Sequence, residues 1–397
     1  MFKKSFNIIK YLNLQSIGLL ELLFAFTPML MGFKLGPFPL SVLMWPVLIV
    51  FTIFRNKKIK VQNFRPLTCF IIYWFIHQLV LLLITDVNKN LMISQVLYFM
   101  AVYFLYPSLD VNKLRGAMNL VALISIAGLL FQWFDILRGN MVHPLQIPGL
   151  EMEEEFRMEK VTLRPSSFYM EPAAYVSYMI CPLALSLIDK KFLWAGLIIF
   201  TMFLTTSTTG ILLSFILLLV YIICSYKVKI SSLIIVSALG IGMVYALVTF
   251  EAFGGALEKI ENTEASTNVR LSQGPRVVAS MQPEEYIFGV PYSTAYDYCT
   301  SGRMSNVLIY GESVYMSTFW DMILCYGIVG LILYLLIYAK LFRMSRLIWP
   351  LLACLCATLF SDPDGIKSNF VYKLIFMLVI ALGEKQSYKW RITNKTR

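Results

Sequence analysis

The chain has 397 residues, of which 58% are hydrophobic and only 14% are charged, and its mean hydropathy is +0.70. A soluble globular domain carries roughly 25% charged residues, so this chain has too little polar surface to cover a water-soluble core. The net charge of +11 would suggest a nucleic-acid partner in a soluble protein, but the placement of these charges indicates a membrane topology. We therefore expect an all-α polytopic membrane protein and no nucleic-acid partner.

The N-terminus is basic but lacks the other features of a cleavable signal peptide. The apolar segment 17–33 has no small-residue cleavage site after it, so we interpret it as a first span. Six of the seven cysteines lie in apolar segments and only Cys299 is in a loop, which argues against a disulfide framework. His77 and His143 are far apart and are not flanked by cysteine or carboxylate clusters, so no metal site and no cofactor is predicted.

Apolar segments recur along the chain at lengths that suit a bilayer, whose hydrocarbon core of about 30 Å needs roughly 17–25 residues per helix. The candidate spans are 17–33, 37–54, 67–85, 91–107, 117–137, 170–188, 192–206, 209–224, 231–250, 313–339, 347–361 and 369–383. The stretch 192–224 carries the polar run Thr205–Gly210 at its centre. It is interpreted as two short spans joined by a tight turn, with one kinked helix as the alternative.

The basic residues test this topology. With the N-terminus inside, the segments assigned to the cytoplasm hold twice as many lysines and arginines as those assigned to the outside. Short inside loops are dense in positive charge and long outside loops are dilute, as the positive-inside rule requires. About 12 transmembrane helices would then form a single domain, 1–397, with both termini cytoplasmic and with two long outside loops at about 138–169 and 251–312.

The first long loop ends in Arg164-Pro-Ser-Ser-Phe-Tyr-Met-Glu171-Pro172. Pro172 suits the first turn of a helix, where its missing N–H costs nothing. Glu171 then sits at the positive end of the helix dipole. It is either a capping carboxylate with Arg164 as its solvated partner or a functional group. For Arg164 a functional role is favoured, because an arginine beside a helix N-terminus just above the membrane suits a pyrophosphate.

The second long loop carries Arg270 and Arg276, followed by Phe288-Gly289. Guanidinium groups bind phosphate oxygens bidentately, and two arginines six residues apart could point into one cavity. The same spacing is also common for two exposed arginines on a helix, so both interpretations stay open.

Polar residues also occur where the second loop re-enters the membrane. Asp321 is predicted two to three turns inside the span 313–339, either facing a cavity or in a hydrogen-bonded structural role. Gly327 and Gly330, in the run Tyr326-Gly-Ile-Val-Gly330, are expected to permit close helix packing.

The order and spacing of these motifs resemble the bacterial O-antigen polymerase (Wzy-type) family, within the O-antigen ligase/polymerase group. The likeness covers roughly residues 117–340. The features that carry it are the Arg164–Pro172 run before a span, the Thr205–Gly210 break, Arg270 and Arg276 leading into Phe288-Gly289, and the Tyr326–Gly330 run.

The resemblance implies a glycosyltransferase-C-like membrane fold with the two long loops in the periplasm. Such proteins act in lipopolysaccharide biosynthesis at the periplasmic face of the bacterial inner membrane, without a metal, cofactor or nucleotide sugar. They join undecaprenyl-pyrophosphate-linked oligosaccharide repeat units into a polysaccharide. Their partners are these lipid-linked glycans and membrane lipids, and a chain-length regulator is a further candidate partner.

The resemblance also assigns roles to residues of this chain. Arg164, Arg270 and Arg276 would bind the pyrophosphates of the donor and acceptor lipids. Glu171 and Glu312 are the candidate general bases that deprotonate the acceptor hydroxyl. The supporting residues would be Tyr175, Tyr315 and Asp321.

Two departures from the family pattern and two alternatives remain. The ligase branch carries a histidine late in its large periplasmic loop, and this chain has none there, which favours polymerase over ligase. The usual glycine-x-glycine is Gly289-Val-Pro291 here, so the local loop geometry differs.

The alternatives are an O-antigen ligase or related lipid-linked glycan transferase and a lipid-linked oligosaccharide flippase. Carriers tend to have internal repeats, short loops and midplane charges, and this sequence has no visible repeat.

Overall fold

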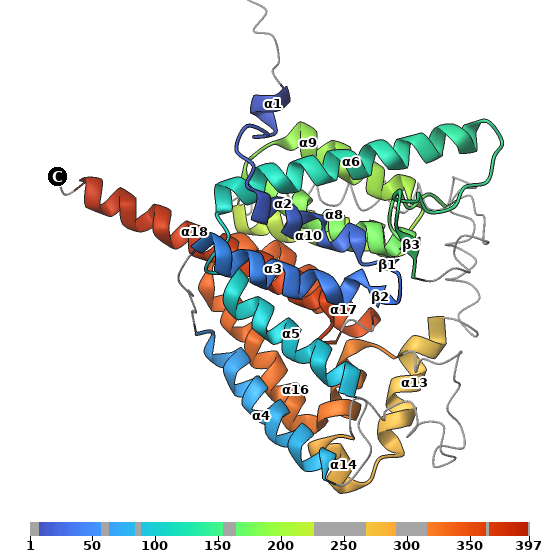
Figure 1. Ribbon diagram of the computed structural model, residues 1–397, viewed down its shortest axis with the longest axis vertical. Helices are drawn as coiled ribbons and strands as arrows, with labels where there is room; N and C mark the ends of the chain where they lie inside the picture. Colours follow the sequence, from blue (N-terminus) through green and yellow to red (C-terminus); the bar gives the residue numbers. More distant parts are fainter. Residues whose placement is uncertain are drawn as a thin grey trace, which may run out of the picture.

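The computed structural model describes residues 8–56, 63–83, 89–153, 164–225, 267–290, 316–362 and 365–395, and the structural statements below concern these ranges. Helices make up most of them (Figure 1). They are α1 (Ile8–Tyr11), α2 (Leu19–Leu30), α3 (Leu40–Asn56), α4 (Arg65–Leu82), α5 (Lys89–Leu105), α6 (Val111–Leu137), α8 (Pro172–Ile188), α9 (Phe192–Leu204), α10 (Thr208–Ser225), α13 (Thr267–Ala279), α14 (Pro283–Phe288), α16 (Thr318–Met344), the 3-10 helix η3 (Arg346–Ile348), α17 (Trp349–Ser361) and α18 (Ser368–Lys395).

The predicted apolar segments coincide with helices. Eleven of the twelve overlap α2 to α6, α8 to α10 and α16 to α18, and the remaining one, 231–250, lies outside the described residues. The stretch 192–224 forms two helices, because the chain turns between Leu204 and Thr208 with Thr206 in a left-handed conformation at φ 53°. The two-helix interpretation of this stretch is therefore confirmed.

The protein is embedded in a membrane by its apolar helices. By length and composition, three described helices could each cross a bilayer: α6, α10 and α16, with 27, 18 and 27 residues. Shorter apolar helices such as α8 and α9 accompany them. Helix α4 exposes an apolar stripe at the spacing of one helix face, formed by Ile72, Phe75, Ile76 and Leu79. An exposed stripe of this kind suits contact with lipid.

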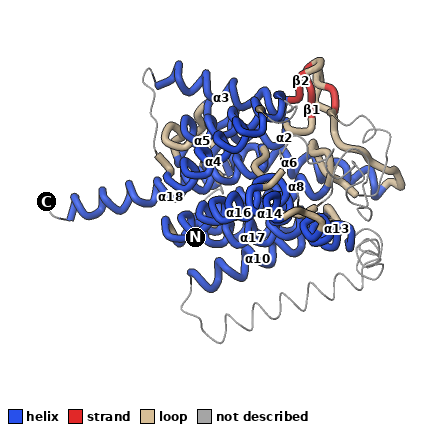
Figure 2. The backbone as a smooth tube through the Cα atoms, turned by 90° about the horizontal axis from the view of Figure 1, so that it is seen from below, coloured by secondary structure: helices blue, strands red, loops and turns tan. Residues whose placement is uncertain are grey.

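Segments that the charge pattern assigns to opposite sides lie at opposite ends of the helix bundle. At one end Arg55 pairs with Glu21 at 2.8 Å, and Arg115 pairs with Asp189 at 3.4 Å. At the other end the first long loop meets the α2–α3 turn in a small sheet. Figure 2 shows this sheet far from the C-terminal end of α18.

The sheet has the strand order β2-β1-β3, with both pairs antiparallel. Its strands are β1 (Phe33–Leu35), β2 (Phe38–Pro39) and β3 (Glu151–Met152). The side chains of Lys34 and Glu151 are 3.7 Å apart across it. The sequence analysis did not anticipate these strands. They tie the first long loop to the end of α2.

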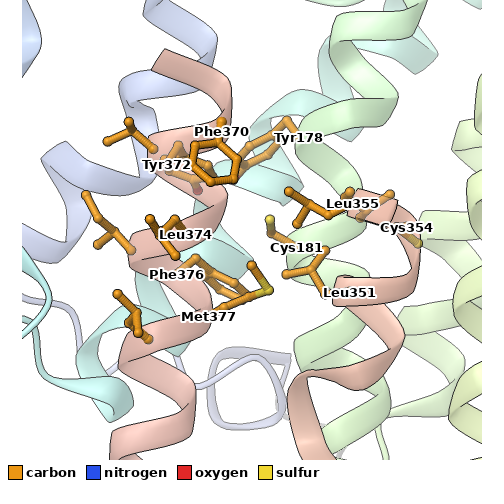
Figure 3. Close-up of a cluster of buried hydrophobic side chains, with 14 of the residues drawn as sticks. Tyr178, Cys181, Leu351, Cys354, Leu355, Phe370, Tyr372, Leu374, Phe376 and Met377 are labelled. Atoms are coloured by element: carbon orange, nitrogen blue, oxygen red, sulfur yellow. The ribbon is translucent and has the colours of Figure 1, made fainter. Parts of the chain in front are cut away.

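The buried core extends through most of the described helices, and Figure 3 shows the part of it where α8, α17 and α18 meet. Cys181 of α8 and Leu351 of α17 face Tyr372 and Met377 of α18 there, and all four are buried. Lys373, the one basic residue predicted inside a span, is also buried in α18. This packing fixes α8, whose N-terminus carries Glu171.

Candidate functional site

Glu171 begins helix α8 through its backbone. Its backbone is extended (φ −151°, ψ 159°), Pro172 occupies the first helical position, and the Glu171 carbonyl accepts from the N–H groups of Ala174 and Tyr175. The prediction for Pro172 is therefore confirmed. The Glu171 carboxylate makes no capping hydrogen bond to the first turn, so the capping interpretation is wrong. The charge of the carboxylate does act on Arg164, which is exposed, as the same interpretation expects for a solvated partner.

Arg164 connects the first long loop to the α9–α10 turn. Its Nε–H donates to Thr206 Oγ1 over 3.3 Å. Partial desolvation lowers the pKa of the Arg164 guanidinium, and the negative charge of Glu171 opposes this shift. An arginine stays protonated at physiological pH despite such a shift. The guanidinium is thus a positive charge that is hydrogen-bonded to the Thr206 hydroxyl and favoured by the negative charge of Glu171.

A glutamine of α6 holds the segment after Arg164. Gln132 Oε1 accepts from the backbone N–H groups of Ser166 and Ser167 at 3.0 and 2.7 Å, and its Nε2 donates to the carbonyl of His143 at 2.7 Å. Ser167 is in a left-handed conformation at φ 57°. A Cβ on Gly128, one turn before Gln132, would lie 2.5 Å from Ser167 Oγ. Gly128 and Gln132 together let the loop approach α6 closely.

Two aromatic residues fix the other elements of the site. Trp133 Nε1 donates to the carbonyl of Leu204 at the end of α9, over 2.9 Å. Tyr175 OH donates to Thr201 Oγ1 over 2.9 Å, and Tyr175 is fully buried. Tyr175 therefore ties α8 to α9. Gln132 and Trp133 were not predicted as site residues because both lie inside an apolar span. A polar side chain within such a span was the signal that could have indicated them.

The second loop contributes a helix, α13, that carries Arg270 and Arg276. Arg276 is exposed, and the side chain of Arg270 lies outside the described part of the structure. Six residues of α-helix turn through about 600°, so the two positions are about 120° apart around α13. The two arginines are thus not aligned along one face. Glu312 and Tyr315 lie outside the described residues.

Helix α14 is inserted into a break in α16, at the lower end of the molecule in Figure 1. Gly289 follows α14 at φ 83°, and Gly327 interrupts α16 at φ 64°. The N–H of Val290 donates to the carbonyl of Leu324 over 2.7 Å. Tyr73 OH of α4 lies within hydrogen-bond distance of the carbonyls of Phe288 and Tyr326.

The two glycines of the Tyr326–Gly330 run therefore differ in role. Gly330 permits close packing as predicted, because a Cβ there would lie 2.3 Å from Tyr326 Cβ and 3.2 Å from Tyr73 Cε1. Gly327 also permits close helix packing, but from a non-helical conformation, because a Cβ there would lie 2.1 Å from the Ile287 carbonyl oxygen of α14. It opens α16 to receive α14.

Asp321 lies in the first turn of α16, because this helix begins at Thr318 and not at 313. The prediction that it lies two to three turns inside a span is therefore wrong. Cys325 Sγ donates to Asp321 Oδ1 at 3.6 Å, and the charge of Lys367 acts on this carboxylate. The α17–α18 loop is docked beside it, since Thr318 donates to the Asp362 carbonyl through both its N–H and its hydroxyl.

No protein-family model matches this chain, and a search of curated proteins finds no similar sequence.

Proposed function

We propose that this chain is an O-antigen polymerase of the bacterial inner membrane. In this proposal it joins undecaprenyl-pyrophosphate-linked repeat units at the periplasmic face and uses neither a metal nor a nucleotide sugar. The observation that carries the proposal is the contact between Arg164 and Thr206. These residues are 42 positions apart and belong to two of the motifs on which the family resemblance rests. With Glu171 they form one polar cluster beside the N-terminus of α8.

Arg164 suits the pyrophosphate of the donor lipid. A guanidinium fork binds phosphate oxygens bidentately, and the N-terminus of α8 adds the positive end of a helix dipole. When the bond between the anomeric carbon and the pyrophosphate oxygen breaks, its electron pair stays on that oxygen. A fixed positive charge stabilises the developing negative charge at this point.

The acceptor hydroxyl must lose its proton as its oxygen bonds to the anomeric carbon. The candidate bases are the carboxylates of Glu171 and Glu312, each of which could take up this proton. Glu171 has a second role in this scheme, because its charge favours the position of Arg164.

The arginines of α13 suit the second lipid pyrophosphate. Their positions, about 120° apart around the helix, favour two separate phosphate contacts over one shared clamp. Asp321, in the first turn of α16, is proposed as a supporting residue. Tyr315 is proposed as a further supporting residue.

The membrane arrangement proposed with this function has about twelve spans in a glycosyltransferase-C-like fold, with both termini in the cytoplasm. It is supported by the separation of the segments predicted inside from those predicted outside, which lie at opposite ends of the bundle. Arg164 lies at the end that carries the sheet of β1, β2 and β3, and this end would face the periplasm.

Deletion of the gene, followed by gel analysis of surface polysaccharide, tests the proposal. A polymerase predicts that polymer is lost while a single repeat unit remains on its lipid anchor. Complete absence of glycan from the anchor would indicate a ligase, and lipid-linked units retained on the cytoplasmic side would indicate a flippase. Either of these outcomes would overturn the proposal.

A further inference from the structure

Helix α13 packs directly against the start of α16. The contact is close at Gly274, where a Cβ would lie 2.3 Å from Cδ1 of Trp320. Gln273 precedes this glycine, and Ser317 lies one helical turn before Trp320. Both residues thus belong to the two helix ends that meet at this contact, which we call the α13–α16 seam.

Both residues are buried, and their side chains lack hydrogen-bond partners among the described residues. Gln273 is 2% exposed, and both its Oε1 and its Nε2 lack a partner. Ser317 is 1% exposed, and its Oγ lacks a partner as well. Buried polar groups in folded proteins are nearly always hydrogen-bonded, and an unsatisfied group lowers stability. Methionine would fill a similar volume to Gln273 without this cost, so stability alone does not account for an amide here.

We propose that Gln273 and Ser317 form a subsite for sugar hydroxyl groups. An amide supplies one acceptor oxygen and two donor hydrogens, and a hydroxyl both donates and accepts. Together they match the neighbouring hydroxyls of a sugar, each of which is also a donor and an acceptor. Neither group is charged, so the subsite suits the glycan and not its phosphates.

The position of Gln273 on α13 identifies which sugar it meets. It lies three residues after Arg270 and three residues before Arg276, and residues with this spacing are neighbours on a helix surface. This inference rests on the proposed function, in which those arginines bind a lipid pyrophosphate. The subsite would then take the sugar attached next to that pyrophosphate.

The test uses the full-length protein with Gln273→Met. Loss of hydrogen bonds to the sugar should lower polymer output on the order of tenfold, which corresponds to the binding free energy of one or two such bonds. Thermal unfolding in detergent should stay unchanged or move to higher temperature, because the variant removes an unsatisfied amide. A purely structural glutamine would show the opposite shift in unfolding temperature.

Gln95→Met is the matched control. The Gln95 amide is buried and satisfied, since it accepts from Trp74 Nε1 and donates to Tyr326 OH. This variant should therefore unfold at a lower temperature. Ser317→Ala removes one small hydroxyl and provides a second variant in case Gln273→Met is not inserted. It should lower polymer output several-fold without loss of stability.

Retention of the lipid-linked repeat unit, extracted from the deletion strain, on immobilised protein gives a direct binding measurement. Gln273→Met should reduce this retention. Normal polymer ladders and normal retention with Gln273→Met would overturn the subsite while the proposed function stands. A loss of activity in Gln273→Met that is accompanied by a lower unfolding temperature would overturn the subsite as well, because it would indicate a structural glutamine. The proposed function is tested separately by the gene deletion, and it fails if the deletion leaves the polymer intact or gives the ligase or flippase result described above.

Discussion

The backbone of Gly289 lies against the backbone of Gly327, and neither position has room for a side chain. A Cβ on Gly327 would come within 2.1 Å of the Ile287 carbonyl oxygen, and one on Gly289 would come within 2.5 Å of the Tyr326 nitrogen. This contact fastens the second loop to α16 and thereby sets where α13 can lie.

We expect Gly327→Ala to release α14 from α16. The new Cβ meets backbone atoms, and the φ of 64° disfavours alanine, so the free energy of unfolding should fall by roughly 1–3 kcal/mol. Polymer output should fall with it, because α13 loses its support. Limited proteolysis of the second loop, compared before and after the substitution, measures the release directly.

Gly196→Ala is the control for this experiment. Gly196 lies in α9, and no described atom comes within 4 Å of a Cβ placed there. Alanine has the higher helix propensity, so this variant should keep or slightly raise stability. If the second loop resists proteolysis equally well in Gly327→Ala and in Gly196→Ala, then Gly327 does not attach this loop to α16.

For Arg164 the expected effect is on activity and not on insertion. Arg164→Ala should lower the transfer rate roughly 10²–10³-fold, the range seen when a group that stabilises transition-state charge is removed. Arg164→Lys should recover only part of the rate, because an ammonium cannot reproduce a bidentate contact. Gel analysis of the polysaccharide in a complemented deletion strain measures both effects.

Arg138→Ala provides the matched control on the same loop. Arg138 is exposed and lies over the ring of Phe134, with its Cζ 4.0 Å from the ring centroid. Its removal should leave the chain-length ladder normal. Full activity of Arg164→Lys would rule out the bidentate contact, and full activity of Arg164→Ala would remove Arg164 from the site.

The helices could be predicted from the sequence because apolar length is a strong local pattern. The break near Thr206 could also be predicted, since a polar run in the middle of an apolar stretch disfavours a continuous helix. The start of α16 was placed five residues too early, which is why Asp321 was assigned to a deeper position. Apolar composition alone does not mark the first hydrogen-bonded turn.

The contacts that build the site could not be predicted in the same way. The approach of Gln132 to Ser166 depends on which helix packs beside the first long loop, and no local pattern carries that information. Gly289 and Gly327 lie in separate motifs of the sequence, but each leaves room for the backbone beside the other, and only the fold brings them together. The contact of Arg164 with Thr206 likewise joins motifs whose proximity only the fold reveals.

Gln132→Met should cost more stability than any substitution of Arg164. It leaves the buried N–H groups of Ser166 and Ser167 without their acceptor, and each unsatisfied group costs roughly 1–3 kcal/mol. Thermal unfolding measures this cost, and polymer length should fall because the Arg164 segment loses its attachment to α6. An unfolding temperature equal to that of the unmodified protein would show that another group holds the segment.

The Glu21–Arg55 pair should be important for stability but not for activity. Glu21 is fully buried, and its Oε1 accepts from Arg55 at 2.8 Å and from the backbone N–H of Asp110 at 3.0 Å. Arg55→Met leaves a buried carboxylate unpaired, a change that costs roughly 3–5 kcal/mol for fully buried pairs. Because Arg55 is partly exposed, the lower end of this range is expected.

The double variant Glu21→Gln with Arg55→Met isolates the charge effect. It removes the unpaired carboxylate and should recover part of the unfolding temperature lost in Arg55→Met. A double variant less stable than Arg55→Met alone would contradict the assignment of that loss to an unpaired charge.

Thiol labelling in intact cells tests which end of the bundle faces outward. Gly149 lies in the first long loop and Ser280 in the second, and both are exposed. A single cysteine in place of either residue should react with a membrane-impermeant reagent. A cysteine in place of Lys190, in the α8–α9 turn at the opposite end, should react only after permeabilisation. The background must lack the native cysteines, because Cys69 and Cys356 are exposed. Protection of Gly149→Cys together with reaction of Lys190→Cys would reverse the proposed orientation and place Arg164 on the cytoplasmic side, where a periplasmic polymerase could not use it.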